Sequence, residues 1–303
     1  MNVPVDHHFI PAFYLSQWAG QNGKLIECTI KYNKLIAKPV GPKSTGYESH
    51  LYSFPELPPE SAQFIEDDFF RYADQTACLA LDIHLGNSSR QWTAELRSAW
   101  SRFVIAIHLR HPDAMPELRA AAINLWNASG NTSQAEYERI RTPADPETFD
   151  ERIALIDPLI PVKARANMII KVFDNEIVGT HINGMRWATV DLSHSSDKLL
   201  LSDRPVEFFR LKDPNGIISI PISPTKLFVG VNDTAILTKL RQTKPRALVH
   251  SVNKFLVSRA RRFVWASDES SLRFISNNMS RRLEPTPLFP NAGRYETPRA
   301  TES

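Results

Sequence analysis

Two adjacent histidines near the N-terminus have the clearest capacity for chemistry. His7 and His8 shortly precede Pro11, whose ring stiffens the backbone. An imidazole can transfer protons near neutral pH and can bind a divalent metal. Because neighbouring side chains of an extended segment point to opposite faces, we expect one histidine to enter a pocket as an acid or base while the other packs. The alternative is structural, with both rings bonding buried carbonyl groups.

Two carboxylates are candidate partners for these histidines. Asp203 comes just after the strand-like segment 198–201, and a carboxylate at the end of a strand is well placed to face a cleft. It could equally cap its own loop in an Asx-turn ahead of Pro205. Glu48 could serve as an acid, a base or a ligand. In a catalytic arrangement, His7 or His8 would transfer the proton while Asp203 and Glu48 orient or assist.

An arginine at a helix end is the first candidate for binding a substrate. Arg110 begins an Arg-His-Pro break after a run with helical spacing. Its guanidinium could bind a phosphate or a carboxylate, including the carboxylate of Asp203 or Glu48. The alternative is that Arg110 bonds the last carbonyl groups of its own helix, where a cation is favoured.

Positive charge is concentrated in the last third of the chain. The net charge is only +3, but eleven Lys or Arg residues lie between Lys239 and Arg282, against the two acids Asp268 and Glu269. Such an asymmetry is typical of a nucleic-acid or other anionic partner. A solvated basic face that balances acids elsewhere is the plainer interpretation.

Several common functional signatures are absent from the sequence. There is no GxGxxG, no P-loop, no HExxH and no GxSxG, which argues against nucleotide-cofactor redox chemistry and serine-hydrolase chemistry. The motifs leave open whether the protein uses a cofactor or a metal. Cys28 and Cys78 have no CxxC spacing, so we expect neither a disulfide framework nor a thiolate zinc site, and a reducing cytoplasm is the expected setting. No secretory signal and no apolar run of roughly 18–20 residues is present, so no membrane association is expected.

The expected elements define an α+β fold. Segments 24–31 and 34–40 predict a hairpin that turns near Asn33, and 47–54 predicts a further extended piece. Apolar residues recur at helical spacing in a middle region. The expected helices there are 61–85, 93–109, 118–126, 134–141, 147–157 and 160–172, with a polar break at 127–133.

The C-terminal third predicts a mixed or antiparallel sheet. The expected strands are 186–192, 198–203, 206–209, 216–222, 226–231 and 262–266, with a helix over 245–259 before the last strand. We therefore expect one α+β domain over 1–285, made of an N-terminal motif and hairpin (1–55), a helical region (60–172) and a sheet region (176–267). Residues 286–303, rich in prolines and polar residues, predict a flexible tail.

The motifs together resemble a known family. The pattern consists of His7-His8-x-x-Pro-x-Phe-Tyr-Leu, Glu48 with Leu51-Tyr52, Arg110-His-Pro, Leu201-Ser-Asp-Arg-Pro-Val, Ile220-Pro-Ile-Ser-Pro, Asn253, and Arg262-Phe-Val-Trp. It is similar to the bacterial family called domain of unknown function 4238, from about His7 to Ala266. The resemblance implies a cytoplasmic bacterial protein, and its motif positions add Arg204 and Asn253 to the candidate substrate-binding residues. Trp18 and Arg204 depart from the family pattern, which has a phenylalanine and a smaller polar residue there.

Two hypotheses of function follow. The first is a hydrolase or transferase, such as a nuclease, that acts on a phosphorylated or nucleic-acid substrate in the manner of a toxin or phage-defence effector. The second is a non-catalytic binding or interaction module, in which the His, Asp and Arg residues form a structural network. The hypotheses differ in geometry. An enzyme requires these side chains to meet in an open pocket, whereas a structural network seals them in the core.

Overall fold

The computed structural model describes residues 6–58, 62 and 65–280. Its N-terminal hairpin consists of β2 (Leu25–Lys31) and β3 (Lys34–Val40). The two turn residues, Tyr32 and Asn33, have φ values of 49° and 63°, as a two-residue hairpin turn requires. The expected hairpin is confirmed.

The hairpin belongs to a sheet completed by the C-terminal part of the chain. β2 pairs with β10 (Val264–Ala266), which pairs in turn with β6 (Leu201–Ser202), in the order β3-β2-β10-β6. A second sheet has the order β5-β9-β8-β7. Its strands are β5 (Arg186–Asp191), β7 (Glu207–Phe209), β8 (Ile217–Ser223) and β9 (Lys226–Val231). All of these pairs are antiparallel, so the expected α+β class is confirmed.

The N-terminal aromatic motif is fixed to the C-terminal part of the chain. β1 (Asp6–His8) pairs with β4 (Tyr47–Ser49), and the short helix α1 (Ala12–Leu15) follows β1. The indole of Trp18 donates to the carbonyl of Leu199 at 2.8 Å, and the hydroxyl of Tyr14 donates to the carbonyl of Pro221. Both aromatic side chains are fully buried, so these bonds position the histidine segment against the sheets.

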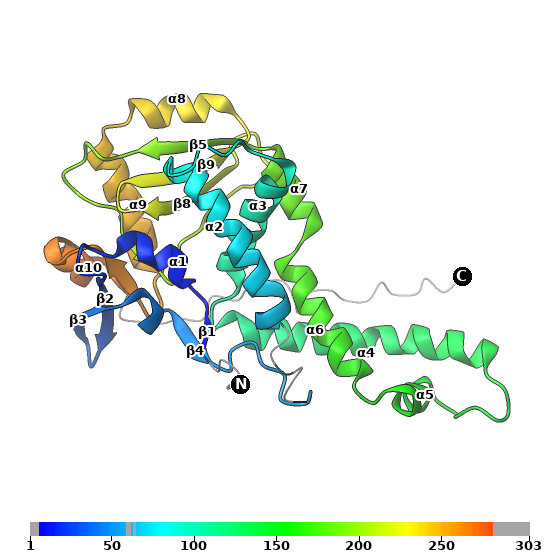
Figure 1. Cartoon of the computed structure of the whole chain (residues 1–303). Coiled ribbons are helices and arrows are strands. Elements are labelled where there is room, and N and C mark those ends of the chain that lie inside the picture. The colour runs from blue at the N-terminus through cyan, green and yellow to red at the C-terminus, as the bar shows by residue number, and fades with distance from the viewer. Residues whose placement is uncertain (1–5, 59–61, 63–64, 281–303) are drawn as a thin grey trace, which may run out of the picture.

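The helical middle covers the core. A π-helix (Ile65–Phe70) leads directly into α2 (Arg71–Leu85), which packs against α3 (Ala94–Leu109) (Figure 1). The helices α6 (Ile160–Phe173) and α7 (Glu176–Gly184) in turn pack against α3. The beginning of the helix expected from Ser61 lies outside the described residues. Within the described part of the chain, no helix is long and apolar enough to cross a membrane.

One expected interruption is wrong. Residues 114–140 form the single helix α4 (Ala114–Ile140), without a break at 127–133. Asparagine, serine and glycine lower helix propensity, but none of them removes a backbone donor as proline does. Tyr137 is buried and donates to the carbonyl of Pro146 in the turn before α5 (Phe149–Ile156), so tertiary contacts hold the far end of α4. Figure 1 shows α4 and α5 projecting from the rest of the molecule.

Four α-helices of the described residues were not expected. They are α1, α7, α8 (Thr234–Gln242) and α10 (Leu272–Asn278). Each spans at most nine residues, too short a window to establish a helical period. The helices α7 and α8 begin at residues whose side chains cap the helix, Asn175 and Asp233. The helix expected at 245–259 is confirmed as α9 (Pro245–Arg259). The expected flexible tail, 286–303, lies outside the described residues.

Candidate functional site

His7 lies in the core. Its ring is fully buried, and Nδ1 accepts a hydrogen bond from the backbone N–H of Tyr52 at 3.0 Å. The ring also stacks on that of Tyr52, with the centroids 5.5 Å apart and the planes 1° from parallel. Through this bond, His7 joins β1 to the segment that follows β4. Within β4 itself, Glu48 is the cross-strand partner of His7.

His8 occupies a different environment. It pairs across the strands with Tyr47 and is half-buried, and its Nε2 atom has no hydrogen-bond partner among the described residues. Burial, and then the positive charge of Arg110, lower the pKa of His8 below its ordinary value. This shift favours the neutral imidazole, and one of its nitrogen atoms is not engaged by the described part of the protein.

Arg110 is an internal clamp. Its side chain is 1% exposed and binds Asp74 through both terminal nitrogen atoms, at 3.1 and 3.3 Å. Its Nε atom donates to the carbonyl of Phe9 at 3.3 Å, and the guanidinium carbon lies 4.9 Å from the ring centroid of Phe70. The carboxylate partner is thus Asp74 rather than Asp203 or Glu48.

Sequence reasoning missed Asp74, although a signal was present. Asp74 lies on the same helix face as Phe70, Ala73 and Ala77. These three apolar residues are buried, and the Asp74 side chain is 24% exposed. An acid on an apolar stripe requires a buried cation or a proton. Burial raises the pKa of Asp74, and the charge of Arg110 opposes that shift.

Asp203 holds a distant loop. It is 3% exposed and accepts the backbone N–H groups of three successive residues, Arg261 at 3.0 Å, Arg262 at 2.5 Å and Phe263 at 3.3 Å. Burial raises the pKa of Asp203 to about 6, against the opposing effect of these three hydrogen bonds. The carboxylate therefore caps the loop between α9 and β10, in place of its own loop.

Asn253 performs a similar task on α9. It is buried, its amide nitrogen donates to the carbonyl of Lys198, and its amide oxygen accepts the N–H of Leu200, both at 2.8 Å. The side chain thereby replaces a strand partner for residues 198–200. This explains why the expected strand 198–203 is reduced to Leu201–Ser202.

An exposed ion-pair network lies at the turn between α3 and α4. Asp113 accepts a hydrogen bond from Arg204 at 3.2 Å and pairs with Arg262 at 3.7 Å, and Arg262 also binds Glu48. The side chains of Asp113, Arg262 and Glu48 are 40–45% exposed, whereas that of Arg204 is only 14% exposed. The structure thus brings together the candidates Glu48 and Arg204 at the surface.

The charges of two further arginines act on the histidines beside this network. The pKa of His111 is lowered to about 3, first by burial and then by the charge of Arg204, with a smaller contribution from Arg261. The pKa of His108 is lowered to about 4 by burial and then by the charges of Arg259 and Arg204. We call Arg204, Arg259, Arg261 and Arg262 the arginine corner.

Two buried nitrogen atoms at the arginine corner have no partner among the described residues. They are Nδ1 of His111, a residue that is 6% exposed, and Nε of Arg204. A buried polar atom without a partner costs about 1–3 kcal/mol unless a water or ligand satisfies it. Guanidinium groups bind phosphate oxygens in a bidentate manner, and the carboxylates of Asp113 and Glu48 that share this surface are exposed to solvent. The corner therefore contains donor groups of the kind that anion sites use, two of which pair with Asp113 and Glu48 in this structure.

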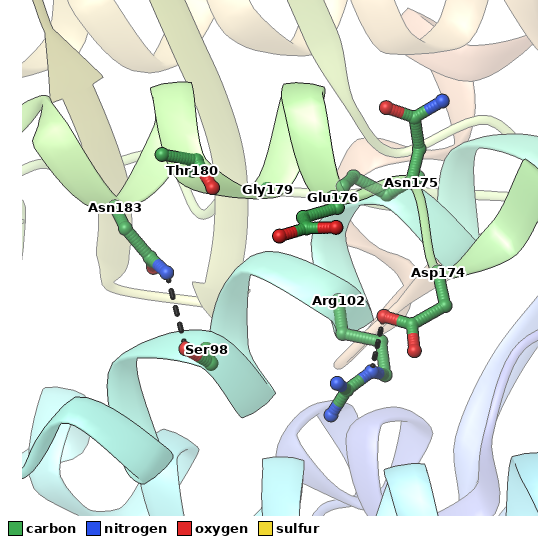
Figure 2. Close-up of a pocket in the computed structure, with 9 residues that line it drawn as sticks. Ser98, Arg102, Asp174, Asn175, Glu176, Gly179, Thr180 and Asn183 are labelled. Atoms are coloured by element: carbon green, nitrogen blue, oxygen red, sulfur yellow. Dashed lines mark hydrogen bonds and ion pairs between the residues drawn. The ribbon is translucent and has the colours of Figure 1, made fainter. Parts of the chain in front are cut away.

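A separate cavity of about 330 Å³ lies between α3 and α7 (Figure 2). None of the candidate residues from the sequence motifs lines it. Within the described ranges, no group of three or more His, Cys, Asp or Glu residues is arranged to hold a metal ion.

A family model described as "Protein of unknown function (DUF4238)" matches residues 6–270, nearly the whole chain. The chain belongs to the DUF4238 family. Neither the curated proteins nor the solved structures contain a match. In this DUF4238 protein, the motif residues divide into two groups. His7, Arg110, Asp203 and Asn253 are buried and bond segments distant in sequence, whereas Glu48 and Arg204 join the surface network.

Proposed function

We propose that this DUF4238 protein is a non-catalytic binding module for a phosphate-bearing polyanion, and that this polyanion is a nucleic acid. The observation that carries the proposal is that Arg204 and Arg262, from two distant segments, meet at Asp113 in the α3–α4 turn. Beside them, in the described part of the chain, Nδ1 of His111 and Nε of Arg204 have no partner. The buried motif residues support this proposal because each engages the protein itself.

The extent of the basic surface favours a polyanion over a single phosphate. Arg246, which also binds Asp197, and Lys254 are exposed residues of α9, and this helix ends at Arg259, a member of the arginine corner. At 1.5 Å per residue, Arg246 and Arg259 are about 20 Å apart along the helix axis. A nucleic-acid strand carries a phosphate every ~3.4 Å of its axis, so this distance spans about six phosphates. Arg281 and Arg282, which belong to the same basic region of the sequence, lie outside the described residues.

Removal of two corner arginines tests the proposal. The double variant Arg259→Ala/Arg261→Ala is expected to bind a 20-nucleotide DNA or RNA at least tenfold more weakly than the wild type, because each lost phosphate contact removes favourable counterion release. Fluorescence anisotropy measures this affinity, and the melting temperature monitors the fold. The variant should keep the wild-type melting temperature within a few degrees, since surface substitutions cost about 0.5 kcal/mol.

A matched control distinguishes the loss of a specific binding surface from the general effect of a lower net positive charge. Lys239→Ala/Arg241→Ala removes the same charge from α8, which packs on β5 and β9. β5 is one edge of the second sheet, and Arg204 precedes β7 at the other edge. Equal losses of affinity in the two double variants would contradict a binding surface at the corner, as would a wild type that does not bind.

A hydrolase or transferase acting on the same class of ligand is the second candidate. The position of His8 favours this candidate. Its Nε2 atom has no hydrogen-bond partner among the described residues, and its lowered pKa favours the neutral imidazole. His8 pairs with Tyr47 in β4, next to Glu48. If His8 is a general base, His8→Ala should abolish cleavage of the 20-nucleotide probe while leaving its binding within about twofold, since general acid–base catalysis contributes roughly 10²–10⁴-fold to a rate. Gel analysis of the products decides this. Absence of cleavage by the wild type, or equal cleavage by the variant, removes the enzyme hypothesis, including that of a nuclease-type toxin or phage-defence effector.

We also propose a reducing compartment, the cytoplasm, as the setting. Cys28 and Cys78 are both free thiols. Cys28 is buried in β2, and burial raises its pKa to about 12, so it persists as an unreactive thiol. Mass spectrometry of the protein isolated under acid trapping should find both thiols reduced.

A further inference from the structure

The cavity between α3 and α7 is unrelated to the arginine corner and has features of a small-molecule site. Figure 2 shows side chains from both helices and from the Asp174-Asn175 turn around it. The lining consists of Ser98, Arg102, Ile105, Asp174, Asn175, Glu176, Gly179, Thr180 and Asn183. Its volume of about 330 Å³ is at the lower end of ligand pockets and equals that of about eleven waters at ~30 Å³ each.

A glycine keeps one wall of this cavity open. Gly179 lies in the middle of α7, where glycine costs about 1 kcal/mol relative to alanine. Its φ is not in the left-handed region, and a Cβ added to it would lie 4.0 Å from Cδ1 of Ile105, an ordinary contact. The backbone therefore gives no reason for glycine at this position. The absent side chain does leave space between the two helices.

The cavity carries an excess of negative charge. Nε of Arg102 donates to Asp174 at 2.7 Å, so these two charges offset each other. The carboxylate of Glu176 remains, and Figure 2 shows it directed into the space between α7 and α3. On the far wall, Asn183 donates to the hydroxyl of Ser98 at 3.1 Å. One guanidinium against two carboxylates leaves the lining net negative.

We propose that this cavity binds a small primary amine. The ammonium group of this ligand lies against the carboxylate of Glu176. It donates further hydrogen bonds to the hydroxyl groups of Thr180 and Ser98. Charge sets the class of ligand, because an anion of the same size would meet an unbalanced carboxylate at close range. The volume sets its size, about that of a diamine or a small amino alcohol.

Titration calorimetry on the full chain tests the proposal, with 1,4-diaminobutane, spermidine and ethanolamine as probes and succinate as the anionic control. We expect saturable binding of at least one amine and none of succinate. Glu176→Gln should weaken amine binding at least tenfold. Because Glu176 also stands in the first turn of α7, where a negative charge favours the helix, a second variant is needed.

Gly179→Ala supplies that variant. It should stabilise α7, yet narrow the cavity and weaken amine binding at least fivefold. Gly184→Ala is the matched control, because Gly184 is in the same helix, does not line the cavity, and a methyl group added there would meet nothing within 4 Å. The proposal is overturned if no amine binds, if succinate binds better, or if Glu176→Gln and Gly179→Ala both bind amines like the wild type.

Discussion

The variant Arg110→Ala is expected to lower the free energy of unfolding by about 3–5 kcal/mol, the usual cost of breaking a buried ion pair from one side. The substitution removes three hydrogen bonds to Asp74 and the bond to the carbonyl of Phe9. It also empties the space over the ring of Phe70, which adds a cavity cost. Urea denaturation followed by circular dichroism measures the change.

An exposed ion pair provides the control for Arg110. Arg246 binds Asp197 at 3.0 Å, with 76% and 45% of the two side chains exposed. Exposed pairs contribute about 0–1 kcal/mol, so Arg246→Ala should leave the urea midpoint nearly unchanged. A loss below 1 kcal/mol for Arg110→Ala, equal to that of the control, would show that the clamp does not hold the N-terminal segment.

The second large effect is a pH dependence that belongs to Asp203. Its pKa is raised from the ordinary 3.8 to about 6 in the folded protein, so the folded state binds a proton more tightly than the unfolded state. The stability contributed by this group is therefore fully present below pH 4 and is lost as the pH rises through 6. About two pKa units correspond to about 3 kcal/mol.

Comparison with Asp203→Asn isolates this contribution, because all other titrating groups are shared. Relative to the variant, the wild type should gain about 2 kcal/mol of unfolding free energy between pH 7 and pH 4. Urea denaturation at four pH values measures the difference. A constant difference across this window, or one that falls on acidification, contradicts the burial of an ionisable Asp203.

The parts of the fold that depend on local signals were predictable. The hairpin turn at Tyr32-Asn33 and the helix that starts at Pro245 are confirmed. In contrast, the break expected in α4 is wrong, because contacts of Tyr137 far along the helix outweigh the low propensity of the polar residues before it. The short helices α7 and α8 were missed because nine residues are too few to establish a helical period in the sequence.

In the candidate site, too, some features could be predicted from the sequence and others could not. The residue types indicated which side chains take part in polar contacts, and Glu48 and Arg204 are connected in one surface network through Arg262 and Asp113. Their partners were not predictable, since Asp203 binds a loop 58 residues away and Arg110 binds Asp74 across 36 residues. Sequence spacing cannot reveal such pairs without a fold. Asp74 is the exception, because an acid on an apolar helix face requires a partner.

The salt dependence of nucleic-acid binding tests the central proposal most directly. For a duplex probe, log K against log salt concentration should fall with a slope of about −0.9 per phosphate contact. Arg259→Ala/Arg261→Ala should reduce the magnitude of that slope by about 1.8, and the control Lys239→Ala/Arg241→Ala should leave it unchanged. A slope that is the same in the corner variant and the wild type, or that decreases in the α8 control instead, would contradict phosphate binding at the arginine corner.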